Sequence, residues 1–110
     1  MAETFSNANE TKRITLNASA GLATQVDFSA GARSFLIKFY AADGTTTGIG
    51  QFAYTGSDGG AIDSDAWRVE AGEVLSIPLR NKESVEALSS IYVASADSLG
   101  IVQILSSEVD

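Results

Sequence analysis

Short runs of alternating apolar and polar residues recur along this chain, separated by segments rich in Gly, Asp, Asn and Ser. Apolar positions spaced two apart lie on one face of a β-strand, whereas the three-to-four spacing of an amphipathic helix is weak throughout. The clearest run is residues 33–40, in which Phe35, Ile37 and Phe39 share one face. The pattern therefore predicts a protein built from short strands.

The same alternation predicts further strands along the rest of the chain. They cover residues 12–17, 22–28, 47–54, 66–69, 74–79, 90–94 and 101–106. Pro78 cannot donate a ladder hydrogen bond, so its strand is expected at a sheet edge or near its own end. The last two strands are expected to form a closing hairpin across residues 97–100. Only residues 81–89 are compatible with a helix, of one or two turns at most.

Two neighbouring segments in the middle of the chain differ in how firmly their sequences define a structure. Gly48 and Gly50 make the strand at 47–54 a weakly held one, bulged or at an edge. Residues 55–65 are polar and glycine-rich, which predicts the longest internal loop. After that loop, the alternation at Trp67 and Val69 indicates an inward-facing pair.

About eight short antiparallel strands joined by polar turns are typical of a single-domain β-sandwich or a jelly-roll-like barrel. The chain has 110 residues, 45% of them hydrophobic, which suffices for one core. We expect a flexible N-terminal arm at residues 1–11 and one β-domain at 12–110, because Phe5 is the only large apolar residue of the arm. The predicted core contains Phe35, Ile37, Leu75, Ile77, Val93 and Val102.

Composition removes several classes of function. The sequence contains no His and no Cys, so it can build neither a Ser-His-Asp triad nor a cysteine nucleophile, and it lacks the soft ligands of zinc and copper. Seven basic residues against fourteen acidic ones give a net charge of −7, which repels phosphate backbones. No apolar run approaches the ~20 residues of a membrane span. We therefore expect no enzymatic activity, no cofactor or metal, no nucleic-acid partner and no membrane partner.

Two weak motifs have a simpler structural interpretation. Asp58, Asp63 and Asp65 are hard oxygen ligands of the type that hold calcium, but the order of an EF-hand loop is missing, so a solvated acidic loop is favoured. Residues 48–53 read Gly-Ile-Gly-Gln-Phe-Ala, which superficially matches a dinucleotide-binding pattern. That pattern needs a preceding parallel strand and a following helix, so a glycine-containing strand or bulge is favoured.

Aromatic residues provide the candidate contact residues. Trp67, with Tyr40, Tyr54 and Tyr92, can form a platform for a sugar ring, which makes a carbohydrate-binding module one hypothesis. Alternation favours a core position for Trp67 instead. Phe5, Trp67 and Tyr54 are the candidate interface residues, with Phe5 expected to anchor the arm on a partner.

The second half of the chain resembles a known group of proteins. The residues that carry the resemblance are 67–73 (Trp-Arg-Val-Glu-Ala-Gly-Glu), 75–80 (Leu-Ser-Ile-Pro-Leu-Arg), 91–94 (Ile-Tyr-Val-Ala) and 100–105 (Gly-Ile-Val-Gln-Ile-Leu), together with the strand at 35–38. Their order is similar to that in small virion proteins of tailed bacteriophages, especially head decoration or cement proteins and head-fibre bases.

The resemblance implies a non-enzymatic structural protein that sits on an assembled capsid and reinforces it. Its expected partner is the major capsid protein or another virion protein, and it is expected to be a homo-oligomer such as a trimer. The expected location is the virion, after synthesis in the host cytoplasm. A structural component of the phage tail or of the head-to-tail junction is the alternative within the same class.

Overall fold

The computed structural model describes residues 3–6, 9–32, 34–78 and 88–107, which form nine strands. The strands are β1 (Glu3–Phe5), β2 (Glu10–Thr15), β3 (Thr24–Ala32), β4 (Ser34–Tyr40), β5 (Gly50–Ala53), β6 (Trp67–Val69), β7 (Leu75–Pro78), β8 (Leu88–Ser95) and β9 (Ile101–Ser107). Within the described ranges no helix is long and apolar enough to cross a membrane.

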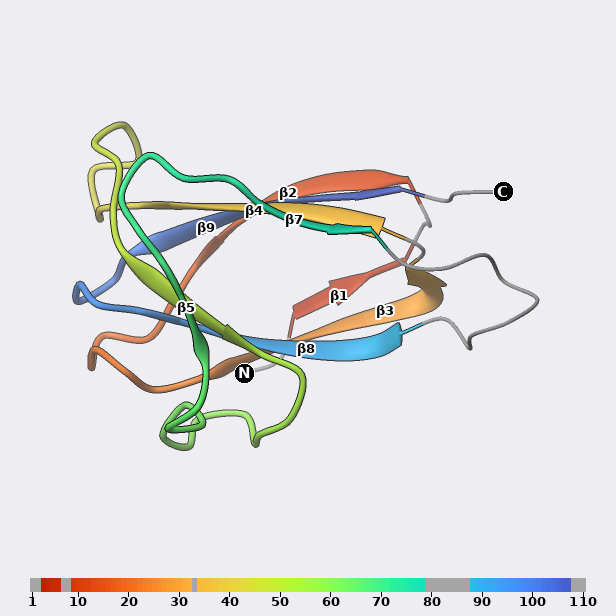
Figure 1. Cartoon of the computed structure of the whole chain (residues 1–110), viewed down its shortest axis with the longest axis horizontal. Coiled ribbons are helices and arrows are strands. Elements are labelled where there is room, and N and C mark those ends of the chain that lie inside the picture. Colours follow the sequence, from red (N-terminus) through yellow and green to blue (C-terminus); the bar gives the residue numbers. More distant parts are fainter. Residues whose placement is uncertain (1–2, 7–8, 33, 79–87, 108–110) are drawn as a thin grey trace.

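The strands form two sheets that pack face to face (Figure 1). One sheet has the order β1-β3-β8-β5-β6 and the other the order β2-β9-β4-β7. This arrangement confirms the predicted all-β sandwich. The strand pairs are antiparallel except for β1 and β3, which run parallel. β7 is an edge strand, as the proline at its end predicts.

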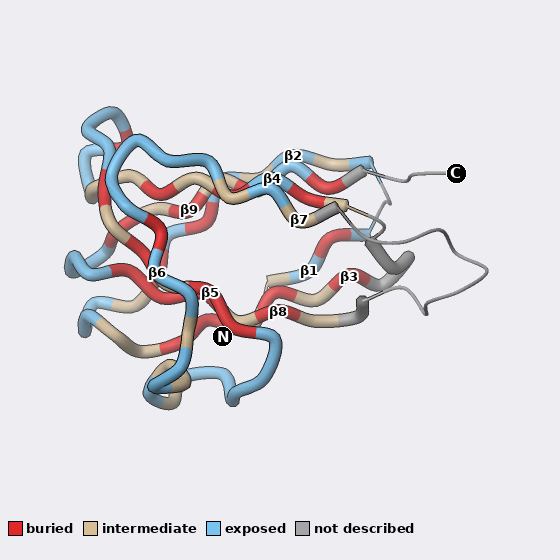
Figure 2. The backbone as a smooth tube through the Cα atoms, viewed as in Figure 1, coloured by how far each residue is buried: buried red, intermediate tan, exposed pale blue. Residues whose placement is uncertain are grey.

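The core lies between the two sheets, where buried residues alternate with more exposed ones along the strands (Figure 2). Phe28 of one sheet stacks on Phe35 of the other, with ring centroids 5.5 Å apart. Six predicted core residues divide into two groups. Phe35, Ile37, Val93 and Val102 are at most 1% exposed, whereas Leu75 and Ile77 are partly buried against the core. The second group is less covered because it belongs to the edge strand β7.

The N-terminal segment does not form the expected arm. Glu3–Phe5 is strand β1, in which Phe5 lies opposite Phe28 of β3. The Phe5 side chain is 0% exposed, and its ring centroid lies 5.2 Å from that of Phe28. Strand β2 already begins at Glu10. The expected boundary between residues 1–11 and 12–110 is therefore wrong for the described part of this segment, which belongs to the β-domain.

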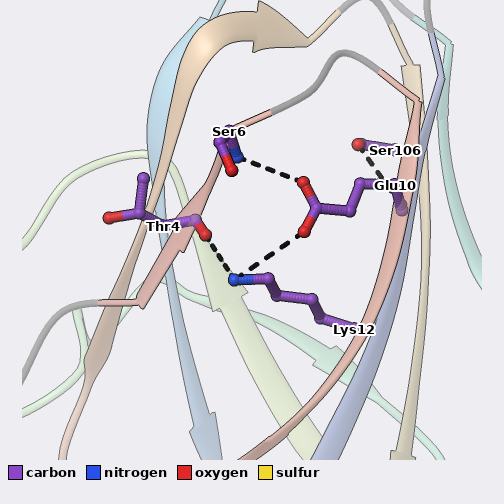
Figure 3. Close-up of polar contacts among 5 residues, drawn as sticks. All are labelled: Thr4, Ser6, Glu10, Lys12 and Ser106. Atoms are coloured by element: carbon purple, nitrogen blue, oxygen red, sulfur yellow. Dashed lines mark hydrogen bonds and ion pairs between the residues drawn. The ribbon is translucent and has the colours of Figure 1, made fainter.

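Polar contacts fix β1 against the start of β2 (Figure 3). The backbone N–H of Ser6 donates to Glu10 Oε1 at 3.1 Å, and the Lys12 ammonium donates to the backbone oxygen of Thr4. Glu10 Oε2 lies 3.8 Å from Lys12 Nζ, and the Ser106 hydroxyl donates to the Glu10 backbone oxygen at 3.4 Å. The first two hydrogen bonds connect the two layers at this edge, because β1 and β2 belong to different sheets, whereas the contact of Ser106 lies within the four-stranded sheet.

The expected closing hairpin is also wrong. Residues 90–94 lie in β8, which pairs with β3 and β5, whereas residues 101–106 lie in β9, which pairs with β2 and β4. The connection between them passes from one sheet to the other, with Leu99 at a φ of 57° and its N–H donating to the Asn17 backbone oxygen. Alternation had shown correctly that both strands face the core, since Ile91 and Ile104 are fully buried.

The glycine-containing strand is an internal strand rather than an edge. β5 lies between β8 and β6. Gly50 packs directly under the Phe39 ring, and a Cβ at this position would lie 2.2 Å from Phe39 Cδ2. Gly50 thus lets β5 approach the opposite sheet closely. Residues 79–87, which include most of the segment expected to be helix-compatible, lie outside the described residues, and residues 88 and 89 begin β8.

Candidate functional site

The three predicted interface residues have different positions in the fold. Phe5 is buried in the core, whereas Trp67 is 66% exposed and Tyr54 is 52% exposed. Trp67 lies opposite the buried Phe52 in the register of β5 and β6, so it should share the inward face with Phe52 and Val69. Val69 is indeed only 1% exposed, but the expectation that Trp67 is a core residue is wrong. β6 is the outermost strand of its sheet, and its first residue is left largely uncovered.

Trp67 and Tyr54 line one hollow of about 320 Å³, here called the aromatic hollow. The Tyr54 ring lies edge-on to the Phe52 ring, with centroids 4.9 Å apart and an interplanar angle of 79°. Phe52 is 4% exposed and belongs to the core, so the ring of Tyr54 packs against a buried side chain. The complete lining is Phe52, Ala53, Tyr54, Thr55, Asp63, Asp65, Ala66 and Trp67.

The acidic residues of the long loop do not gather into one cluster. Asp63 accepts hydrogen bonds from the Thr55 hydroxyl at 3.4 Å and from the Asp65 N–H at 2.9 Å. Asp58 accepts from the Gln25 N–H at 2.9 Å, and this backbone hydrogen bond lowers the pKa of Asp58. Asp58 thus attaches the loop to β3, away from the other two carboxylates. Across the described ranges, no three His, Cys, Asp or Glu residues are grouped as metal ligands.

A second hollow, of about 220 Å³, lies on the outer face of the four-stranded sheet and is here called the basic hollow. Leu36 and Leu105 face each other across β4 and β9 and are 40% and 39% exposed. Lys38 is the charged residue of its lining, and its Nζ lies 5.4 Å from the Tyr40 ring centroid. The full lining is Leu36, Ile37, Lys38, Tyr40, Val74, Gln103 and Leu105.

Sequence reasoning missed the basic hollow as a candidate site. The available signal was the second face of residues 33–40, where Leu36 and Tyr40 alternate with Lys38. Large apolar groups on both faces of a strand are typical of a sheet that is covered on both sides. In this structure only the inner face is covered.

A third, smaller hollow connects the other two. It has a volume of about 50 Å³ and is lined by Trp67, Val69, Glu73, Val74 and Leu75. It shares Trp67 with the aromatic hollow and Val74 with the basic hollow, so it lies between these two.

These hollows collect most of the exposed apolar surface of the described residues. Six large apolar side chains are markedly exposed among the described residues, and five of them line the hollows, whereas Leu99 does not. The other five are here called the exposed apolar band: Leu36, Tyr54, Trp67, Val74 and Leu105. Isolated apolar residues on a surface are ordinary, but a contiguous set marks an interaction site.

The predicted four-residue aromatic platform is only half assembled. Tyr54 and Trp67 lie in the same hollow, whereas Tyr40 lines the basic hollow. The Tyr92 side chain lies beside Gly56, where a Cβ would be 3.2 Å from Tyr92 Cγ. In the glycine pattern at residues 48–53, the first two residues precede β5 and the other four form it, as the interpretation as a glycine-containing strand predicts.

No protein-family model, curated protein or solved structure matches this chain.

Proposed function

We propose that this chain is a non-enzymatic structural virion protein that decorates or cements an assembled bacteriophage capsid through protein–protein contacts. The observation that carries the proposal is the exposed apolar band, in which an aromatic pair and three aliphatic side chains adjoin one another on a folded domain. Covering such a surface with another protein removes apolar side chains from water, which lowers the free energy of the complex. The resemblance of residues 67–73, 75–80, 91–94 and 100–105, with the strand at 35–38, to decoration proteins supports the choice of partner, a major capsid protein or another virion protein.

Trp67 is the residue expected to contribute most to that contact. Trp and Tyr are enriched among the interface residues whose truncation costs about 2 kcal/mol or more. Trp67 leaves 66% of its surface available, and the hollow beside it is lined by Tyr54, whose ring is held by the core. Aromatic side chains have few rotatable bonds, so they lose little conformational entropy when they are buried.

Co-sedimentation with undecorated bacteriophage capsids tests the proposal. Wild-type protein should saturate a fixed number of sites, and Trp67→Ala should weaken binding by about 30-fold, the equivalent of ~2 kcal/mol. Leu99→Ala is the matched control, because Leu99 is 48% exposed but lies outside the band. Purified tails and connectors, sedimented in parallel, measure the alternative tail or head-to-tail role. Wild-type protein that stays in the supernatant with capsids would refute the decoration role.

One observation favours a second candidate function, that of a carbohydrate-binding module. Tyr54 and Trp67 share their hollow with the carboxylates of Asp63 and Asp65, and aromatic faces beside a few polar groups are typical of small-ligand sites. A glycan array probed with wild-type protein and with Trp67→Ala separates the two functions. Binding to a defined glycan that Trp67→Ala abolishes, with an unchanged circular dichroism spectrum, would support the module.

A further inference from the structure

The two ends of the exposed apolar band differ in charge and complement each other. We propose that Trp67 of one copy docks into the basic hollow of a second copy of this chain, which places Asp63 and Asp65 of the first copy beside Lys38 of the second. In the isolated protein a second copy would thus cover Trp67, which capsid binding also uses, and self-association and capsid binding are therefore measured in separate experiments.

The basic hollow suits an indole side chain. Its floor and walls include Leu36, Leu105 and Val74, which supply apolar contact, and its volume is about 220 Å³. Gln103 offers an amide oxygen that can accept a hydrogen bond from the indole N–H, which is a donor only. Lys38 supplies a cation at the rim, and Trp is the best aromatic partner for a cation.

The basic hollow lies in a positively charged region of an acidic protein. Arg13, Gln103 and Lys38 form one row across β2, β9 and β4, and none of the described residues that line the hollow is acidic. Arg13 is held in place, since its Nη2 donates to the Gly44 backbone oxygen at 2.8 Å and its guanidinium lies 4.4 Å from the Tyr40 ring centroid. The chain as a whole has a net charge of −7. A partner surface with negative charge beside an apolar group is therefore favoured.

The surroundings of Trp67 combine negative charge with an apolar group. Asp63 and Asp65 line the same hollow as Trp67. The nearest cation in sequence, Arg68, forms an ion pair with Glu70 and so does not neutralise them. The described part of the chain thus presents both halves of one complementary contact, an apolar ring with carboxylates and an apolar hollow with a cation.

The two halves are different surfaces of the same molecule. Each copy therefore offers one Trp67 and one basic hollow, and contacts of this kind form a reciprocal pair, a closed ring or an open filament. Sedimentation equilibrium should show wild-type protein above its monomer mass of 11.5 kDa, and less associated at high salt because the contact includes opposite charges. Trp67→Ala and Lys38→Glu should each weaken association by about tenfold or more.

Mixing the two variants gives the sharpest test. Lys38→Glu keeps its Trp67 but has a damaged hollow, and Trp67→Ala keeps its hollow but lacks the indole. At a concentration where each variant alone is monomeric, the mixture should form a 1:1 pair through the single intact contact. A mixture that stays monomeric, while wild-type protein associates, would overturn the proposal.

Charge reversal provides an independent measurement. Asp65→Lys should weaken association, and the double variant Lys38→Glu/Asp65→Lys should recover it because the opposite charges are exchanged. Asp97→Lys is the control, because it changes the net charge equally at an exposed position outside the three hollows. Wild-type protein that is monomeric at every concentration, or an equal effect of Asp97→Lys, would overturn the proposal. Capsid binding by a purely monomeric wild type would leave the proposed function standing without this contact.

Discussion

Replacing Phe5 by alanine tests whether the N-terminal segment is part of the folded core. Phe5 is 0% exposed and contacts the Phe28 ring at a centroid separation of 5.2 Å, so the substitution removes a buried ring from between the sheets. A buried Phe→Ala change typically costs about 3–5 kcal/mol, out of the ~5–15 kcal/mol that stabilise a small domain. For a chain of this length the loss lowers Tm by about 10 °C or more.

Chemical denaturation followed by circular dichroism measures the effect. Thr4→Ala is the matched control, because Thr4 is exposed on the same strand and only its backbone oxygen accepts the Lys12 hydrogen bond. We expect a large fall in the denaturant midpoint for Phe5→Ala and a change within about 0.5 kcal/mol for Thr4→Ala. Equal midpoints for the two variants would show that β1 is not docked in solution.

Two further predictions concern the strand β5 and the turn after β4. Gly50→Ala should destabilise the domain by about 1–3 kcal/mol, because the new Cβ would lie 2.2 Å from the buried Phe39 ring; an unchanged denaturant midpoint would mean that β5 sits farther from the opposite sheet. Asp43 accepts hydrogen bonds from the Thr46 hydroxyl and from the N–H groups of Thr45 and Thr46, and these lower its pKa from 3.8 to about 2. Its contribution to stability is therefore present above pH 3.8 and is lost as the pH falls through about 2. Thr46→Val, which removes the largest cause, should raise the pKa of Asp43 in a carboxyl NMR titration, and an unchanged titration curve would contradict the assignment.

The sequence predicts which side chains face the core far better than it predicts which strands pair. Alternation identified Phe35, Ile37 and Val102 as core residues because side-chain direction has a period of two in any strand. The same signal cannot distinguish a hairpin from a connection that crosses between sheets. Residues 90–94 and 101–106 therefore read as a hairpin although they belong to opposite layers.

The candidate surface shows a related limit. Alternation assigned Trp67 to the inward face, but exposure depends on whether another element covers that face, and this is a property of the assembled sheets. The prediction for Phe5 was wrong in the opposite direction, since it placed a buried residue on a flexible arm. A single apolar residue in a polar segment has no periodicity that could reveal its pairing with β3. The basic hollow combines Leu36 and Lys38 of β4 with Leu105 of β9, so only the register brings its lining together.

The fluorescence of Trp67, the only tryptophan of the chain, tests the assembly role most directly. The side chain is 66% exposed in the monomer, so a neutral quencher such as acrylamide should reach it readily at protein concentrations too low for self-association. The control is to repeat the titration with Leu99→Ala, which leaves Trp67 unchanged. When undecorated capsids are added in excess, we expect the emission to shift to shorter wavelength and the quenching to fall several-fold, because assembly covers the exposed apolar band. Unchanged emission and quenching at saturating capsid would contradict the proposed function.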